Sequence, residues 1–207
     1  MINKVFLIFI GLCLWAPMAR AGDDCLDYKL TPRVTLTTPL WRKEVVQPLA
    51  PMDLWHGNVI ATLADNYEVG VDLTGIEDGW CVALKSVDAA VGYEHFLVHI
   101  DGRHAPGSCA YNAILTHEDE HIRAYLSVMD ELADDMRAAV TSAANAVMPV
   151  FVRDASDIDA AIDELHRTLQ AHPDLILMHQ RIGATQEIKN KAVDQHDDGS
   201  RLRQCGG

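Results

Sequence analysis

A continuous helical pattern from about Cys109 to Ala146 is the feature that most constrains how this chain of 207 residues can fold. Apolar side chains recur there at spacings of three, four and seven residues, which indicates one buried stripe along an α-helix. The stripe consists of Leu115, Ile122, Leu126, Met129, Ala133, Met136 and Val140, and a second apolar row beside it consists of Ile114, Tyr125, Val128 and Leu132. Pro149 ends the pattern, since proline cannot continue a helix. We therefore predict one long helix with a buried face.

Within this helix lies a His-Glu-x-x-His motif, formed by His117, Glu118 and His121. A helix turns roughly 100° per residue, so the two histidines project from the same face, one turn apart. Two neutral imidazoles there can occupy two corners of a tetrahedral zinc site, and the carboxylate of Glu118 can accept a proton from a metal-bound water. The motif falls at the edge of the buried arc, where a cleft is expected. Asp119 and Glu120 fall on the opposite arc and are expected to face solvent.

The segment from Ser108 to Leu115, with its Cys-x-Tyr sequence at Cys109 and Tyr111, runs directly into the motif. This combination resembles the bacterial predicted secreted zinc-dependent proteases, over about Gly79 to Ala139. The resemblance implies Zn²⁺ as cofactor, a zincin-like fold in which a short β region precedes the motif helix, and a metallopeptidase activity on a peptide or protein substrate. It does not indicate which substrate.

The third protein ligand of a catalytic zinc is not fixed by the motif. Such a site needs three protein ligands and one open position. A gluzincin-like arrangement draws the third ligand from the next helix, and the upstream histidines are a second source. The candidates on the next helix are Asp159, Asp163, Glu164 and His166, and the upstream candidates are His95, His99 and His104.

Residues 1–21 are predicted to be a cleaved export signal. Lys4 supplies a positive start, Val5 to Trp15 is apolar but too short to span a bilayer, and Ala19 and Ala21 form a small-x-small cleavage site. Residues 22–207 are then one zincin-like domain, located in the periplasm or secreted, with no membrane insertion after cleavage. The formal charge of the whole chain is −13, which argues against nucleic acid or an anionic membrane surface as a partner. The sequence does not predict the oligomeric state.

Four cysteines remain after the signal, an even number that favours two disulfide bonds in an exported chain. Three pairings are possible. We favour Cys81–Cys109, which would join a strand to the start of the motif helix, and Cys25–Cys205, which would join the chain ends. No Cys-x-x-Cys pair exists, so the cysteines are not expected to bind the metal.

The remaining chain predicts an α+β fold, in which a small antiparallel β-sheet is followed by the long motif helix and two further helices. Strands are expected near residues 34–38, 67–75, 80–91 and 96–100, and a short helix over 52–63. After the motif helix, we expect a helix capped by Ser156 or Asp157, a third helix over 175–193, and a loose tail from His196.

The sequence also allows a non-enzymatic alternative, an exported module that binds zinc structurally or binds a partner protein on its acidic helix face. A catalytic site predicts three protein ligands on separate elements with an open coordination position. A structural site predicts four protein ligands, and a protein-interaction module predicts none.

Overall fold

The computed structural model describes residues 24–47, 56–197 and 199–206, so the expected signal segment, residues 1–21, lies outside the described residues. The described chain forms a five-stranded sheet and three long helices, a mixed α and β architecture. In order, the elements are η1 (Asp24–Tyr28), β1 (Arg33–Thr37), β2 (Arg42–Val46), β3 (Gly57–Ile76), β4 (Gly79–Ile100), α1 (Cys109–Ala146), β5 (Val150–Val152), η2 (Ala155–Asp157), α2 (Ile158–Gln170), α3 (Pro173–His196) and α4 (Ser200–Gln204).

The sheet is built on a long hairpin of β3 and β4. The two strands pair antiparallel along their whole length, from Gly57 opposite Ile100 to Ile76 opposite Gly79. The other edge of β4 carries β5, β1 and β2 in succession, and both β1 and β2 run parallel to β4. The expected all-antiparallel sheet is therefore wrong. β3 separates the first two strands from β4 in sequence, and this long excursion supplies the crossover that a parallel pairing needs.

The sequence pattern divided this hairpin into shorter strands because its alternation is interrupted. Register shifts occur between Thr62 and Leu63 and between Gly70 and Val71. Each such irregularity moves the inward-facing positions by one residue, so a strict period of two is lost although the strand continues. The helix expected over 52–63 is wrong from Gly57 onward, where β3 begins, and residues 52–55 lie outside the described residues.

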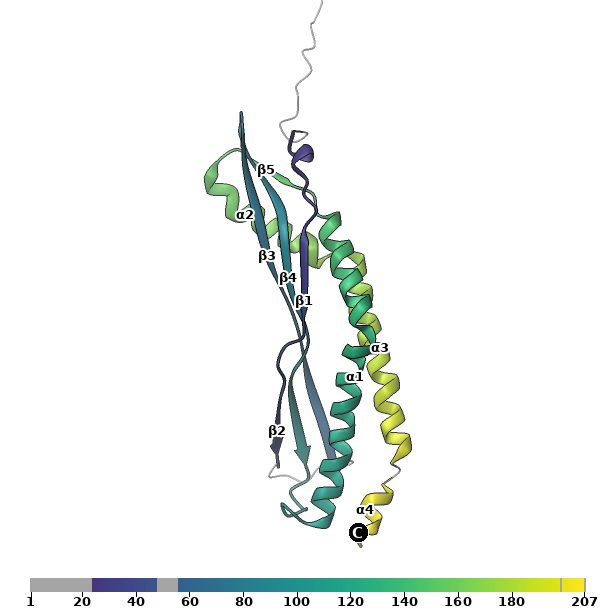
Figure 1. Cartoon of the computed structure of the whole chain (residues 1–207). Coiled ribbons are helices and arrows are strands. Elements are labelled where there is room, and N and C mark those ends of the chain that lie inside the picture. Colours follow the sequence, from purple (N-terminus) through teal and green to yellow (C-terminus); the bar gives the residue numbers. More distant parts are fainter. Residues whose placement is uncertain (1–23, 48–55, 198, 207) are drawn as a thin grey trace, which may run out of the picture.

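The expected long helix is confirmed as α1, from Cys109 to Ala146. Ser108 caps its start, with the side-chain oxygen accepting a hydrogen bond from the backbone N–H of Tyr111 at 3.2 Å. Its buried face packs against the sheet and against α3, which lies alongside it (Figure 1). The shared core includes Phe96, Ile100, Leu132, Met136, Leu165, Leu169, Leu175 and Ile182.

The two disulfide bonds join Cys25 to Cys81 and Cys109 to Cys205. The favoured pairing of Cys81 with Cys109 is wrong because nearly the whole of β4 lies between the two residues. Cys81 follows the start of that strand and α1 begins after its end, so roughly 60 Å of extended chain separates them. The expected pairing of Cys25 with Cys205 fails for the same reason. The polar tail, expected to be loose, forms the short helix α4 before Cys205.

Across the described ranges, no helix combines the length and the apolar character that crossing a membrane requires.

Peptide mapping of the oxidised protein under non-reducing conditions should recover one linked pair containing Cys25 and Cys81 and another containing Cys109 and Cys205. This result is expected because the Cα atoms of the two pairs lie 5.5 and 5.6 Å apart, within the distance that a disulfide spans. A Cys81–Cys109 link in folded protein would contradict the strand pairing of β3 and β4.

Candidate metal centre

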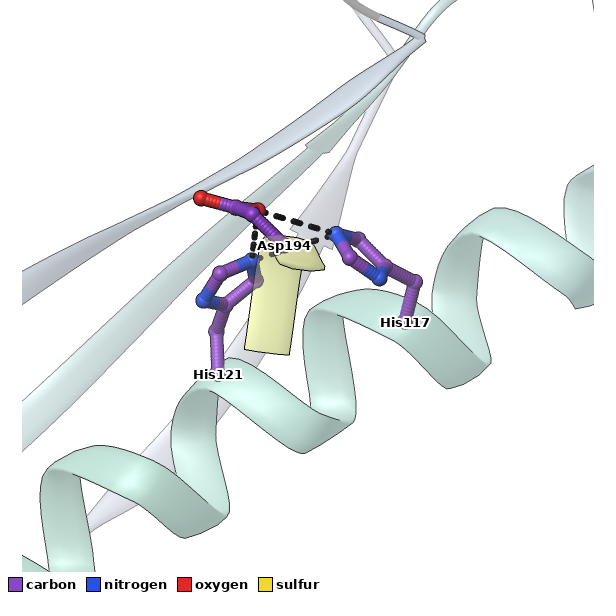
Figure 2. Close-up of side chains that lie close together, drawn as sticks. All are labelled: His117, His121 and Asp194. Carbon is purple, nitrogen blue, oxygen red and sulfur yellow. Dashed lines mark hydrogen bonds and ion pairs between the residues drawn. The ribbon is translucent and has the colours of Figure 1, made fainter. Parts of the chain in front are cut away.

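Three side chains from two helices converge at one point. His117 and His121 project from α1, and Asp194 projects toward them from the end of α3 (Figure 2). The Nε2 atoms of the two histidines are 3.1 Å apart. Oδ1 of Asp194 lies 3.1 Å from Nε2 of His121 and 3.5 Å from Nε2 of His117. The ligands of a tetrahedral zinc, bound at 2.0–2.1 Å, are separated by about 3.3 Å, so the three donors fit three corners of such a site.

The outer nitrogen of each imidazole faces a residue of α3 or of its C-terminal end. Nδ1 of His121 is 2.9 Å from Oδ1 of Asn190, an oxygen that can only accept, so Nδ1 carries the proton. Nδ1 of His117 lies 3.7 Å from Oδ2 of Asp197 and is buried without a hydrogen bond. An acceptor behind the ring directs the lone pair of the inner nitrogen toward the metal position. His121 thus has the outer hydrogen bond that metal-binding histidines usually make, and His117 has a carboxylate facing the same position without a hydrogen bond.

Asn190 is itself held by neighbouring polar side chains. It hydrogen-bonds to Tyr125, which also hydrogen-bonds to Gln186. Gln186 in turn accepts a hydrogen bond of 2.6 Å from the hydroxyl of Tyr93 on β4. Burial raises the pKa of the Tyr125 hydroxyl above its usual range, so this hydroxyl remains a donor at neutral pH. The network connects the sheet, α1 and α3 behind His121.

Glu118 lies beside the two histidines and is 3 % exposed. Burial raises the pKa of Glu118 to about 8, and the negative charges of Asp194 and Asp119 contribute further. A carboxyl group in this range can take up and release a proton near neutral pH, as a general base must. The first residue of β3, Gly57, faces this carboxyl so closely that a Cβ atom placed on it would lie 2.6 Å from Oε1 of Glu118.

A cavity of about 610 Å³ opens in front of these groups, a volume within the range of small-molecule and peptide sites. Its walls come from the start of β3, from α1, from the end of α3 and from α4. The lining residues are His56, Gly57, Asn58, Val59, Ala113, Ile114, His117, Glu118, His121, Tyr125, Asn190, Asp194, Asp197, Gly199, Arg201 and Leu202. The cleft expected at the edge of the buried arc of the motif helix is therefore present.

The structure does not bring the expected third ligands to this point. Asp159, Asp163, Glu164 and His166 lie on α2, at the opposite end of the molecule from the start of α1 (Figure 1). Among the described residues, the group able to hold a metal contains none of them and none of the upstream histidines.

Each upstream histidine contacts a different partner. His95 faces Glu44 at 3.5 Å, His99 contacts Asn58 at 3.0 Å, and His104 contacts His56 at 3.1 Å. Two of these partners, Asn58 and His56, line the cavity, but His95, His99 and His104 themselves do not.

Asp194 was missed because it lies one residue beyond the third helix expected from the sequence. The signal that identifies it is the spacing of Asn190, Asp194 and Asp197, which repeats at four and three residues and so marks one polar face on that helix.

Asp119 and Glu120 do not simply face solvent, as the sequence suggested. The carboxylate of Asp119 pairs with Lys43 of β2 at 2.9 Å, and that of Glu120 pairs with Arg201 of α4 at 2.7 Å. The two charged positions inside the motif thus hold neighbouring elements in place.

No family model, curated protein or solved structure matches this chain. The resemblance to predicted secreted zinc-dependent proteases stays a prediction.

Replacing Gly57 with Ala should destabilise the protein, because the added methyl group would lie 2.6 Å from Oε1 of Glu118 and 2.5 Å from Cγ2 of Ile114. Overpacking of this kind costs about 1–3 kcal/mol. Gly183→Ala is the matched control, since nothing lies near its added Cβ atom on α3 and alanine favours a helix by about 1 kcal/mol. Urea unfolding of both variants measures the difference, and equal stability would contradict the close approach of β3 to Glu118.

Metal-free protein should lose stability as the pH rises from about 4.5 to about 8, through the titration of Glu118. The folded state keeps a proton that the unfolded chain releases in this window, so the favourable contribution is complete below the lower value and disappears above the upper one. The slope is at most about 1.4 kcal/mol per pH unit for one proton. Urea unfolding in chelator should show a smaller slope for Glu118→Gln, while Glu131→Gln on the exposed face of α1 should keep the wild-type slope.

Proposed function

We propose that this protein is an exported zinc-dependent metallopeptidase. The observation that carries the proposal is the convergence of His117, His121 and Asp194 beside the buried carboxyl of Glu118 in one open cavity. Two imidazole nitrogens and one carboxylate oxygen form a donor set that zinc accepts. The resemblance of the motif region to secreted zinc-dependent proteases supports the same reading.

A zinc ion bound here would supply Lewis acidity, which lowers the pKa of water toward about 7 and polarises a carbonyl group. Glu118 is the general base in this proposal. Its carboxylate accepts the proton of the attacking water and then delivers that proton to the nitrogen of the leaving amine. His117, His121 and Asp194 would hold the metal, and Asn190 keeps His121 in the tautomer that presents Nε2.

The number of donors favours a catalytic site over a structural one. Within the described residues, the group able to hold a metal has three members, whereas a structural zinc is usually closed by four. All three donors line the cavity, and the side chain of Asp194 is 58 % exposed, so a metal bound there would be accessible from the cavity. This openness supports a peptidase over the alternative of a non-catalytic zinc-binding or protein-interaction module.

Two disulfide bonds support the export part of the proposal, since such bonds persist in oxidising compartments. We propose that residues 1–21 are the signal removed on export to the periplasm or beyond, and that the substrate is a peptide or protein.

Purified protein should bind one zinc ion per chain, and His117→Ala, His121→Ala and Asp194→Ala should each lose it, because three protein ligands are the minimum for such a site. His166→Ala is the matched control, since His166 lies on α2 and contributes no donor to the group. Metal content measured by mass spectrometry tests this. Wild-type protein without zinc, after exposure to it, would contradict the metal centre.

Glu118→Gln should retain zinc but lose hydrolysis of an unfolded protein such as fluorescently labelled casein, by about a hundredfold or more, because the amide cannot accept the proton. Glu131→Gln, on the same helix but paired with Lys189, should retain full activity. Undiminished cleavage by Glu118→Gln with zinc bound would remove Glu118 from its catalytic role.

A further inference from the structure

The C-terminal segment, defined here as Asp197 together with residues 199–205, forms part of the cavity wall. Asp197, Gly199, Arg201 and Leu202 all line the cavity in front of the motif. Gly199 adopts a left-handed conformation with φ of +81°, which favours glycine and turns the chain from the end of α3 into α4. The chain therefore passes the metal centre a second time after supplying Asp194.

Asp197 contacts the metal centre from behind. The side chain of Asp197 is only 6 % exposed, and its Oδ2 atom lies 3.7 Å from Nδ1 of His117. The corresponding distance behind His121, from Nδ1 to Oδ1 of Asn190, is 2.9 Å. A carboxylate at this position favours the proton on Nδ1 and so presents the lone pair of Nε2. Asp197 thus faces the outer nitrogen of His117 as Asn190 faces that of His121, but through an ion-pair contact of 3.7 Å and not through a hydrogen bond.

The two supports are held in different ways. Asn190 lies within α3, but Asp197 follows the last residue of that helix, His196. The carboxylate of Asp197 is oriented by the C-terminal segment itself. Nε of Arg201 lies 3.3 Å from Oδ2, and the hydroxyl of Ser200 donates to Oδ1 at 3.4 Å.

The C-terminal segment is in turn fixed to α1 at two points. Nη2 of Arg201 pairs with Glu120, inside the motif, at 2.7 Å. Cys205 is bonded to Cys109, the first residue of α1. The disulfide attaches the C-terminal end of α4 to α1, and the Arg201–Glu120 ion pair attaches its N-terminal end. The C-terminal segment therefore stays against α1 while both contacts are intact.

We infer that the C-terminal segment is a positioning element for the metal centre, in which Arg201 and the Cys109–Cys205 disulfide hold Asp197 against His117. This inference rests on the proposed metal site but assigns a role to residues outside the donor set. Its consequence is that metal affinity depends on a cross-link and an ion pair that touch no donor atom. Supports of this kind contribute roughly 10- to 100-fold in metal affinity.

The test compares the two disulfides. Co²⁺, a coloured substitute for zinc, is titrated into metal-free full-length protein, and its dissociation constant is read from visible absorption. Cys109→Ser with Cys205→Ser should raise this constant roughly 10- to 100-fold. Cys25→Ser with Cys81→Ser is the control, because it also removes one disulfide but leaves the C-terminal segment in place, and its constant should equal that of wild type. Circular dichroism at the assay temperature shows that each variant is folded.

A second pair of variants keeps both disulfides and so remains informative if the double serine variant does not fold. Arg201→Gln should weaken Co²⁺ binding, whereas Arg181→Gln should not, although Arg181 also makes an ion pair of 2.7 Å with α1, through Asp135. Asp197→Ala, which removes the acceptor behind His117, should weaken binding to a similar degree. Combining Asp197→Ala with Arg201→Gln should add no further loss, because both changes interrupt one chain of contacts.

The outcomes separate this inference from the proposed function. Wild-type affinity in both the Cys109/Cys205 and Arg201 variants would overturn the positioning role while leaving the metal centre intact. Equal weakening by both disulfide removals would also overturn it, since the effect would then reflect general stability. Absence of Co²⁺ and zinc binding in wild-type protein would overturn the metal centre itself, and the inference with it.

Discussion

The antiparallel pairing of α1 and α3 is the interaction on which the rest of the structure depends. Arg181 with Asp135, Lys189 with Glu131, and Asn190 with His121 mark successive points along the two helices. Exposed ion pairs contribute little free energy, typically about 0–1 kcal/mol each, so the buried side chains between the helices supply most of the stabilisation. The polar pairs fix the register instead. A shift of one turn would move Asp194 by about 5 Å along the axis and separate it from both histidines.

How much of this could be predicted from the sequence differs between elements for physical reasons. The bounds of α1 follow from its own residues, since a stripe of period 3.6, a serine cap and a following proline are all local. The third donor is not local. Periodicity places Asp194 on a helix face, but it does not show which helix that face meets. The expected disulfide pairing was wrong because the length of β4, which keeps Cys81 far from Cys109, was hidden by its two register shifts, where Lys85 and Glu94 of β4 have no partner on β3.

The site gathers negative charge in a chain that is already acidic. Glu118, Asp194 and Asp197 lie around one cavity, with Arg201 as a neighbouring cation paired to one of them. The raised pKa of Glu118 shows the effect of this crowding together with burial. A divalent cation at the donors would offset the repulsion, so metal binding there would stabilise the fold. The three donor atoms already lie close together without a cation.

The long hairpin of β3 and β4 has a consequence for the molecule as a whole. Its near end carries Gly57 against the motif, and its far end carries the cross-link to Cys25 together with β5 (Figure 1). The candidate metal centre and the Cys25–Cys81 cross-link thus lie at opposite ends of the molecule, separated by the full length of two strands. A substitution near Cys25 would leave the cavity lining untouched, whereas β3, α1, α3 and α4 all contribute residues to that lining.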